Sequence, residues 1–199
     1  MSAELSGRIV RSFEEHIANT QQAQTLLVDD IAAAGELIWN ALLNQNKLLL
    51  VGNGGSAAAA QHMAALLVNR YEFERPGLPA IALAANGAIL TSLATDYPVD
   101  EVFARQVHAL GLRGDVLIAL TTSGRSATVL LAIEAAHARG MQVLVVSGRD
   151  GGNVPEILRV EDLEIRVPAW SSARVREVQM LILHCLCDLI DHQIGGTEG

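Results

Sequence analysis

The feature that most constrains the fold is a regular alternation, after residue 46, of short apolar segments with longer helical ones. The apolar segments lie at residues 47–53, 79–83, 115–122, 141–148 and 163–168, and the helical ones at 56–70, 87–108, 126–139 and 173–194. Strands that are apolar on both faces are typical of parallel sheets covered by helices on both sides. The alternation therefore predicts an α/β fold with a flavodoxin-like, doubly wound, five-stranded parallel sheet.

The N-terminal segment has a different pattern, in which apolar side chains recur at helical spacing from residue 4 to about residue 46. We expect a single domain over residues 1–199, with N-terminal helices in 1–46 and the α/β core in 47–199. Half of the residues are hydrophobic and only 18% are charged, which is apolar for a small protein. We expect an interface between copies of the chain to bury the excess apolar surface. We also expect the N-terminal helices to take part in this oligomerisation.

Composition and charge exclude several classes of protein. The net charge is -8 and no cluster of Lys and Arg stands out, so direct binding to nucleic acid is not expected. No apolar stretch approaches the roughly 20 residues of a membrane span. The first residues are too charged for a signal peptide. The sequence predicts a cytoplasmic protein with no membrane contact.

A glycine-rich loop, GNGGS at residues 52–56, follows the first predicted strand and precedes a helix. Backbone N–H groups and the positive end of the helix dipole at such a loop favour an anion. The spacing from Gly52 to Ala57 also matches a dinucleotide-binding fingerprint, but the acidic residue expected about 20 positions later would be Glu72 or Glu74, in a charged connection rather than at a strand end. No P-loop motif occurs, so a P-loop nucleotide hydrolase is excluded.

A second loop, TTSGRS at residues 121–126, repeats the design of strand, loop and helix. Its hydroxyl side chains are Thr121, Thr122, Ser123 and Ser126. A helix N-cap needs only one hydroxyl, and Gly124 permits close approach to the backbone. Clustered hydroxyls beside free N–H groups suit a phosphate monoester, whose oxygens each accept several hydrogen bonds. The two loops together favour a phosphate monoester over a dinucleotide, which needs only one such loop.

These loops, with NRYEFERPGLPAIAL, GRDGG and SARVREVQ…HCLCDLID, resemble the sugar isomerase (SIS) superfamily over nearly the whole chain after residue 45. The nearest groups are the phosphoheptose isomerases and the related DnaA initiator-associating proteins. The resemblance implies the SIS fold, a homotetramer, and sites for a phosphorylated sugar between subunits. The substrate-binding residues that it implies are Asn53, Gly54, Ser56, Asp96, Thr121, Thr122, Ser123 and Ser126.

The resemblance also bears on catalysis. Phosphoheptose isomerases have a His followed four residues later by a Glu, and a Gln followed eight later by a His; together these bind zinc and move the substrate proton. Here the positions hold His62 and Leu66, and Arg176 and His184. Leucine has no proton to exchange, arginine repels a metal ion, and two histidines alone make a poor zinc site. We therefore expect no catalytic residue and no metal, with His62 and His184 as remnants of a zinc site.

The sequence thus predicts a non-catalytic, regulatory protein without a cofactor, which binds a phosphosugar and resembles the DnaA initiator-associating proteins. Its acidity means that any role in replication would run through protein contacts, with DnaA as the partner. The alternative is a phosphoheptose isomerase that acts on sedoheptulose 7-phosphate in lipopolysaccharide heptose synthesis, with zinc and with His62 and His184 as catalytic residues. A carboxylate from elsewhere, such as Asp96 or Glu177, would then have to act as the base.

Overall fold

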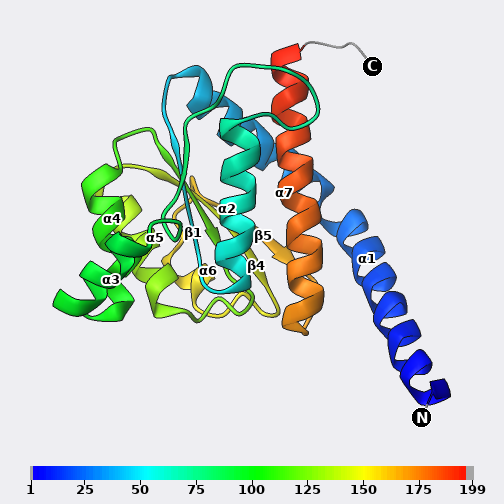
Figure 1. Ribbon diagram of the computed structural model, residues 1–199. Coiled ribbons are helices and arrows are strands. Elements are labelled where there is room, and N and C mark those ends of the chain that lie inside the picture. The colour runs from blue at the N-terminus through cyan, green and yellow to red at the C-terminus, as the bar shows by residue number, and fades with distance from the viewer. Residues whose placement is uncertain (1, 196–199) are drawn as a thin grey trace.

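The fold is built on a sheet of five parallel strands in the order β2-β1-β3-β4-β5, seen in a computed structural model that describes residues 2–195 (Figure 1). The strands are β1 (Leu48–Gly52), β2 (Ala80–Ala82), β3 (Val116–Leu120), β4 (Gln142–Gly148) and β5 (Leu163–Val167). The predicted flavodoxin-like parallel sheet is confirmed. The outermost residues of the predicted domain, 1 and 196–199, lie outside the described residues.

Helices cover both faces of the sheet because successive strand side chains point to opposite sides. Leu48 and Leu50 of β1 belong to a core shared with one set of helices, and Leu49 and Val51 to a core shared with the other. The first set is α1 (Ser2–Leu43), α2 (Gly55–Val68) and α7 (Ser172–Gly195). The second is α3 (Gly87–Asp96), α4 (Val102–Leu110), α5 (Ala127–Ala138) and the short α6 (Val154–Ile157).

The predicted helix over 87–108 is divided into two. α3 ends at Asp96, and a 3-10 turn (Val99–Glu101) leads into α4. Pro98 explains the break, because proline has no N–H to donate and pushes the preceding residue into an extended conformation. Tyr97 has that conformation, with φ −137° and ψ 163°.

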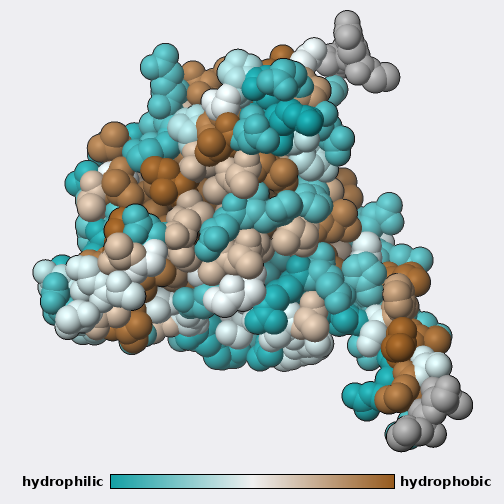
Figure 2. Space-filling model, viewed as in Figure 1, coloured by the Kyte–Doolittle hydropathy of each residue, from teal (hydrophilic) through white to brown (hydrophobic). Residues whose placement is uncertain are grey.

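The N-terminal segment is one continuous helix rather than several. The second half of α1 packs on α7 and β5, and it buries Leu27 and Ile38. The first half projects from the body as an arm (Figure 1), and the space-filling view shows apolar side chains along it (Figure 2). On this arm Ile9 is 59% exposed and Phe13 is 66% exposed.

Buried polar contacts fix α7 against the sheet. The amide nitrogen of Gln179 donates to the carbonyl oxygens of Thr121 (2.9 Å) and Val146 (2.7 Å), at the carboxyl ends of β3 and β4. Near the other end of α7, the buried Arg75 and Asp191 form an ion pair of 2.5 Å. Arg75 also donates to the last turn of α2, so α2 and α7 are held in one register. None of the helices within residues 2–195 is long and apolar enough to cross a membrane.

Candidate functional site

The two predicted anion-binding loops lie side by side because β1 and β3 are neighbours in the sheet. Gly52 at the end of β1 pairs with Leu120 at the end of β3, so both loops leave from the same carboxyl edge. Between them is a pocket of about 200 Å³, lined by Asn53, Ser56, Leu120, Thr121, Thr122, Ser123, Ser126, Val129 and Arg176. Six of the eight predicted substrate-binding residues therefore share one pocket. Their contact with a sugar phosphate stays a prediction.

Asn53 ties the first loop to the second. Its side-chain nitrogen donates to the hydroxyl oxygens of Ser126 (2.7 Å) and Thr128 (2.6 Å), which is the second residue of α5. Thr128 was not expected in the site, since it lies beyond the loop motif. Its two-residue spacing from Ser126 puts the two hydroxyls 3.0 Å apart.

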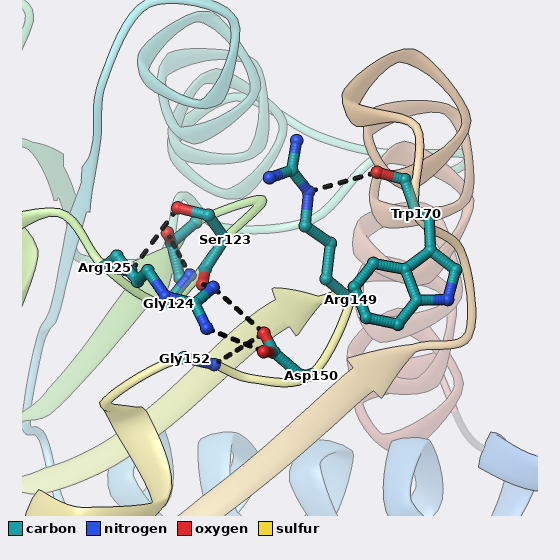
Figure 3. A network of polar contacts seen from close by, with 8 residues as sticks. Ser123, Gly124, Arg125, Arg149, Asp150, Gly152 and Trp170 are labelled. Carbon is teal, nitrogen blue, oxygen red and sulfur yellow. Dashed lines mark hydrogen bonds and ion pairs between the residues drawn. The ribbon is translucent and has the colours of Figure 1, made fainter.

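The second loop is braced from behind by the loop that follows β4 (Figure 3). Gly124 has φ +66°, and a Cβ there would come within 1.8 Å of the Gly151 carbonyl oxygen, so the turn requires glycine. The Arg125 guanidinium donates twice to the Asp150 carboxylate, at 3.1 and 2.6 Å. The pKa of Asp150 falls to about 2, mainly because of the hydrogen bond from Arg125. The positive charge of Arg125 is therefore balanced by the carboxylate of Asp150.

A second brace reaches the first turn of α7. Arg149 donates to the Trp170 carbonyl oxygen (3.0 Å) and to the Ser172 hydroxyl (2.9 Å). The Ser172 hydroxyl lies 3.4 Å from that of Thr122. The start of α7 is therefore held beside the second loop.

The two predicted histidines meet where α2 passes α7. Their Nε2 atoms are 2.9 Å apart, one donating and the other accepting, with ring centroids at 5.2 Å. The Tyr71 ring stacks on His184 at 6.0 Å between centroids. Burial, followed by the nearby Glu72 and Asp188 carboxylates, raises the pKa of Tyr71. Tyr71 comes from the connection after α2, within the NRYEFERPGLPAIAL motif, and it was not among the predicted site residues.

The donor atoms around this histidine pair do not fit zinc. Catalytic zinc takes three protein ligands, and the described part of the chain holds no group of three His, Cys, Asp or Glu residues that could bind a metal. Leu66 packs against the core one turn after His62. The two carboxylates named as substitutes lie elsewhere: Glu177 accepts from His16 (2.9 Å) and Arg174 (2.5 Å) where α1 meets α7, and Asp96 is exposed at the end of α3.

Two predicted substrate contacts stand outside the pocket. Gly54, with φ +54°, lines an adjoining pocket together with Asn53 and residues of α3. Asp96 lines neither pocket. Arg176, in contrast, was not among the predicted substrate-binding residues, and the structure places it in the wall of the pocket. The available signal was its position at the start of α7, the helix that carries His184.

Comparison with known proteins identifies the family. The SIS domain family matches residues 12–148. The chain belongs to the SIS domain family. It is 52% identical to the phosphoheptose isomerase of Alkalilimnicola ehrlichii over 96% of this chain and 97% of that protein, and 52% identical to that of Methylococcus capsulatus over 95% and 97%. The structure of a phosphoheptose isomerase from Neisseria gonorrhoeae matches with a TM-score of 0.90 and 42% identity, over 94% of this SIS domain chain and 98% of the other.

These relatives correct the expected function. The prediction of a regulatory SIS domain protein that is not an enzyme is wrong, because proteins about half identical to it over nearly their whole length are named as isomerases. The prediction treated Leu66 and Arg176 as two lost groups, one position at a time. The resemblance placed His62 and His184 together only as remnants of a zinc site, and the structure brings their Nε2 atoms within hydrogen-bonding distance of each other.

Proposed function

We propose that the protein is a sugar-phosphate isomerase of the phosphoheptose isomerase type, which interconverts a ketose phosphate and an aldose phosphate. The observation that carries this proposal is the 50–52% identity, over nearly the full length, to proteins with that name. The site supports it independently, because a pocket suited to a phosphate and a pair of proton-transfer groups both lie along α2 and α7.

The phosphate is bound in the pocket between the two loops. The hydroxyls of Ser56, Thr121, Ser123 and Ser126 line it, and α2 and α5 both begin beside it. Hydroxyl and backbone N–H groups donate to phosphate oxygens, and both helix dipoles favour the negative charge. By holding the phosphate group, this end of the site binds the substrate and fixes its orientation.

The histidine pair carries out the proton transfer. Isomerisation removes a proton from the carbon next to the carbonyl group and returns one to the former carbonyl carbon. One imidazole of the pair has a free lone pair that can accept the carbon-bound proton, while the N–H of the other donates to the carbonyl oxygen. The imidazole that took the carbon-bound proton then delivers it to the former carbonyl carbon, while the hydroxyl proton on the other carbon passes to the second imidazole, so that a new carbonyl group forms and both rings are restored. No step in this scheme runs through a metal ion.

An isomerase assay on the purified protein tests the proposal. With sedoheptulose 7-phosphate as substrate, we expect conversion to the aldoheptose 7-phosphate, and no conversion by a His62→Asn and His184→Asn double variant. Both proteins should bind the substrate in calorimetry, which separates chemistry from binding. A wild-type protein that binds sedoheptulose 7-phosphate without converting it would reject the proposal.

We also propose that the protein works as a homotetramer, assembled partly through the projecting arm of α1. Five large apolar side chains on this arm are more than half exposed: Leu5, Ile9, Val10, Phe13 and Ile17. A second copy of the chain would remove them from water. We expect Phe13→Glu to shift the mass measured by light scattering toward smaller species, while Glu14→Gln leaves it unchanged. A wild-type monomer at micromolar concentration would reject the assembly.

Two further expectations stay predictions: the association with DnaA and the cytoplasmic location. The first has a direct test, which is capture of purified DnaA by the immobilised intact protein, with the Phe13→Glu variant as a comparison.

A further inference from the structure

Arg176 lies in the wall of the phosphate pocket, and two independent geometric facts place it there. It lines the pocket together with the hydroxyl side chains of both loops. A Cβ added to Gly55 would come within 2.8 Å of its Nε atom, so the arginine side chain runs directly over the first turn of α2. A side chain at position 55 would force the arginine side chain to move from this position.

The charge of Arg176 is not matched by any acidic side chain in the described part of the chain. No carboxylate in residues 2–195 pairs with its guanidinium, whereas Arg125 is paired with Asp150 and Arg174 with Glu177. The pocket wall contains no aspartate or glutamate, and the starts of α2 and α5 add positive potential. An exposed, unpaired guanidinium beside clustered hydroxyls is an arrangement that an anion completes.

We propose that Arg176 is the cationic contact of the substrate phosphate, a specificity-determining residue for the isomerase proposed above, on which this assignment rests. The planar guanidinium can donate two parallel hydrogen bonds to phosphate oxygens, as an amide side chain or a lysine cannot.

The position of Arg176 on α7 also orients the substrate. His184 follows eight residues later on the same helix, a rise of about 12 Å. The phosphate is therefore held at one end of this helix segment and the reacting carbons near the other. This spacing selects an open-chain sugar whose phosphate is on the carbon farthest from the carbonyl group.

Calorimetric titration with inorganic phosphate tests the assignment on the intact protein. We expect Arg176→Gln to weaken phosphate binding about 10- to 100-fold, the usual loss for a hydrogen bond to a charged group. Arg176→Lys should retain part of the affinity. Arg159→Gln is the matched control, because it removes one charge at the opposite edge of the sheet, before β5, and it should bind phosphate like the wild type.

A double-mutant cycle sharpens the test. Gly55→Ala should weaken phosphate binding in the wild type by displacing the arginine, and should have no further effect in the Arg176→Gln background. Additive effects, equal phosphate affinity of wild type and Arg176→Gln, or an equal loss in Arg159→Gln would each overturn the assignment. So would a wild-type protein that binds no phosphate.

Turnover of sedoheptulose 7-phosphate by the same variants separates this assignment from the proposed function. If the wild type shows phosphate binding that depends on Arg176 but no isomerisation, the isomerase proposal fails and Arg176 remains the phosphate contact. If the wild type isomerises and Arg176→Gln leaves both phosphate affinity and KM unchanged, the assignment fails and the isomerase stands.

Discussion

The two ends of the site are constructed differently. The phosphate end is made of loop backbone, hydroxyl groups and one arginine, and it is braced by contacts such as Asn53 to Ser126 and Arg125 to Asp150. The histidine end consists of His62 and His184 facing each other, with Tyr71 stacked beside them. In the proposed function, the many donors of the first end all bind the phosphate, whereas the two imidazoles of the second end transfer one proton between them and the substrate.

This difference implies different sensitivity to substitution. At the phosphate end each donor contributes one of several hydrogen bonds, so the loss of one weakens binding by a limited factor. At the histidine end either imidazole is indispensable to the proposed proton transfer, so its loss should reduce the rate much more than the affinity.

The largest expected effect follows from His184→Ala. We expect kcat to fall by about 10²- to 10⁴-fold, the usual range for loss of a general acid or base, with little change in affinity for inorganic phosphate. Steady-state kinetics with sedoheptulose 7-phosphate and calorimetry with phosphate measure the two quantities. His192→Ala, two turns further along α7, is the control and should keep both. A fall in kcat of less than about ten-fold would remove His184 from the proposed chemistry.

A smaller effect, on binding instead of rate, is expected for Ser123→Ala. The loss of one hydroxyl donor to a charged phosphate should cost about 1–3 kcal/mol of binding free energy, which appears as weaker phosphate affinity and a higher KM. Ser92→Ala on the exposed side of α3 is the matched control. Should Ser123→Ala lower kcat and leave KM unchanged, the two ends of the site would not be separate in function.

The difference between the two ends also explains which parts of the site could be predicted from the sequence. The phosphate end depends on local signals, namely a strand followed by a glycine- and hydroxyl-rich loop and a helix, and residues of both loops do line one pocket. The central strands were predictable for a similar reason, since the apolar runs of β1 and β3 are continuous, whereas β5 alternates charged and apolar residues. Pro98 marks the break between α3 and α4 in the sequence, although the helical pattern on both sides of it predicts one long helix.

The histidine end could not be derived in this way. His62 and His184 are 122 residues apart, and their contact depends on the register between α2 and α7. That register is set by the buried Arg75–Asp191 pair and by the bonds from Arg75 to the end of α2. None of these contacts has a local signature. The resemblance placed His62 and His184 together as remnants of a zinc site, but comparing residues at single positions did not predict the place of Arg176 in the pocket.

The smallest expected effect comes from Asp150→Asn, which breaks the brace behind the phosphate end without touching the pocket. Freeing Arg125 loosens the second loop, and we expect phosphate affinity at pH 7 to fall about two- to five-fold, the range typical of an exposed ion pair. Calorimetry measures this against Asp30→Asn, an exposed carboxylate on α1.

The pH dependence of the unfolding free energy provides a second test of the ion pair between Arg125 and Asp150. The pKa of Asp150 in the folded protein, about 2, lies below its ordinary value of 3.8, so the ion pair stabilises the protein fully above about pH 5 and progressively less as the pH falls toward 2. The difference in unfolding free energy between wild type and Asp150→Asn should therefore be constant from pH 7 to about pH 5 and shrink below that. Denaturant titrations followed by tryptophan fluorescence measure it at each pH. A difference that persists undiminished at pH 3 and below would mean that Asp150 supports the loop through its size and hydrogen bonds rather than its charge.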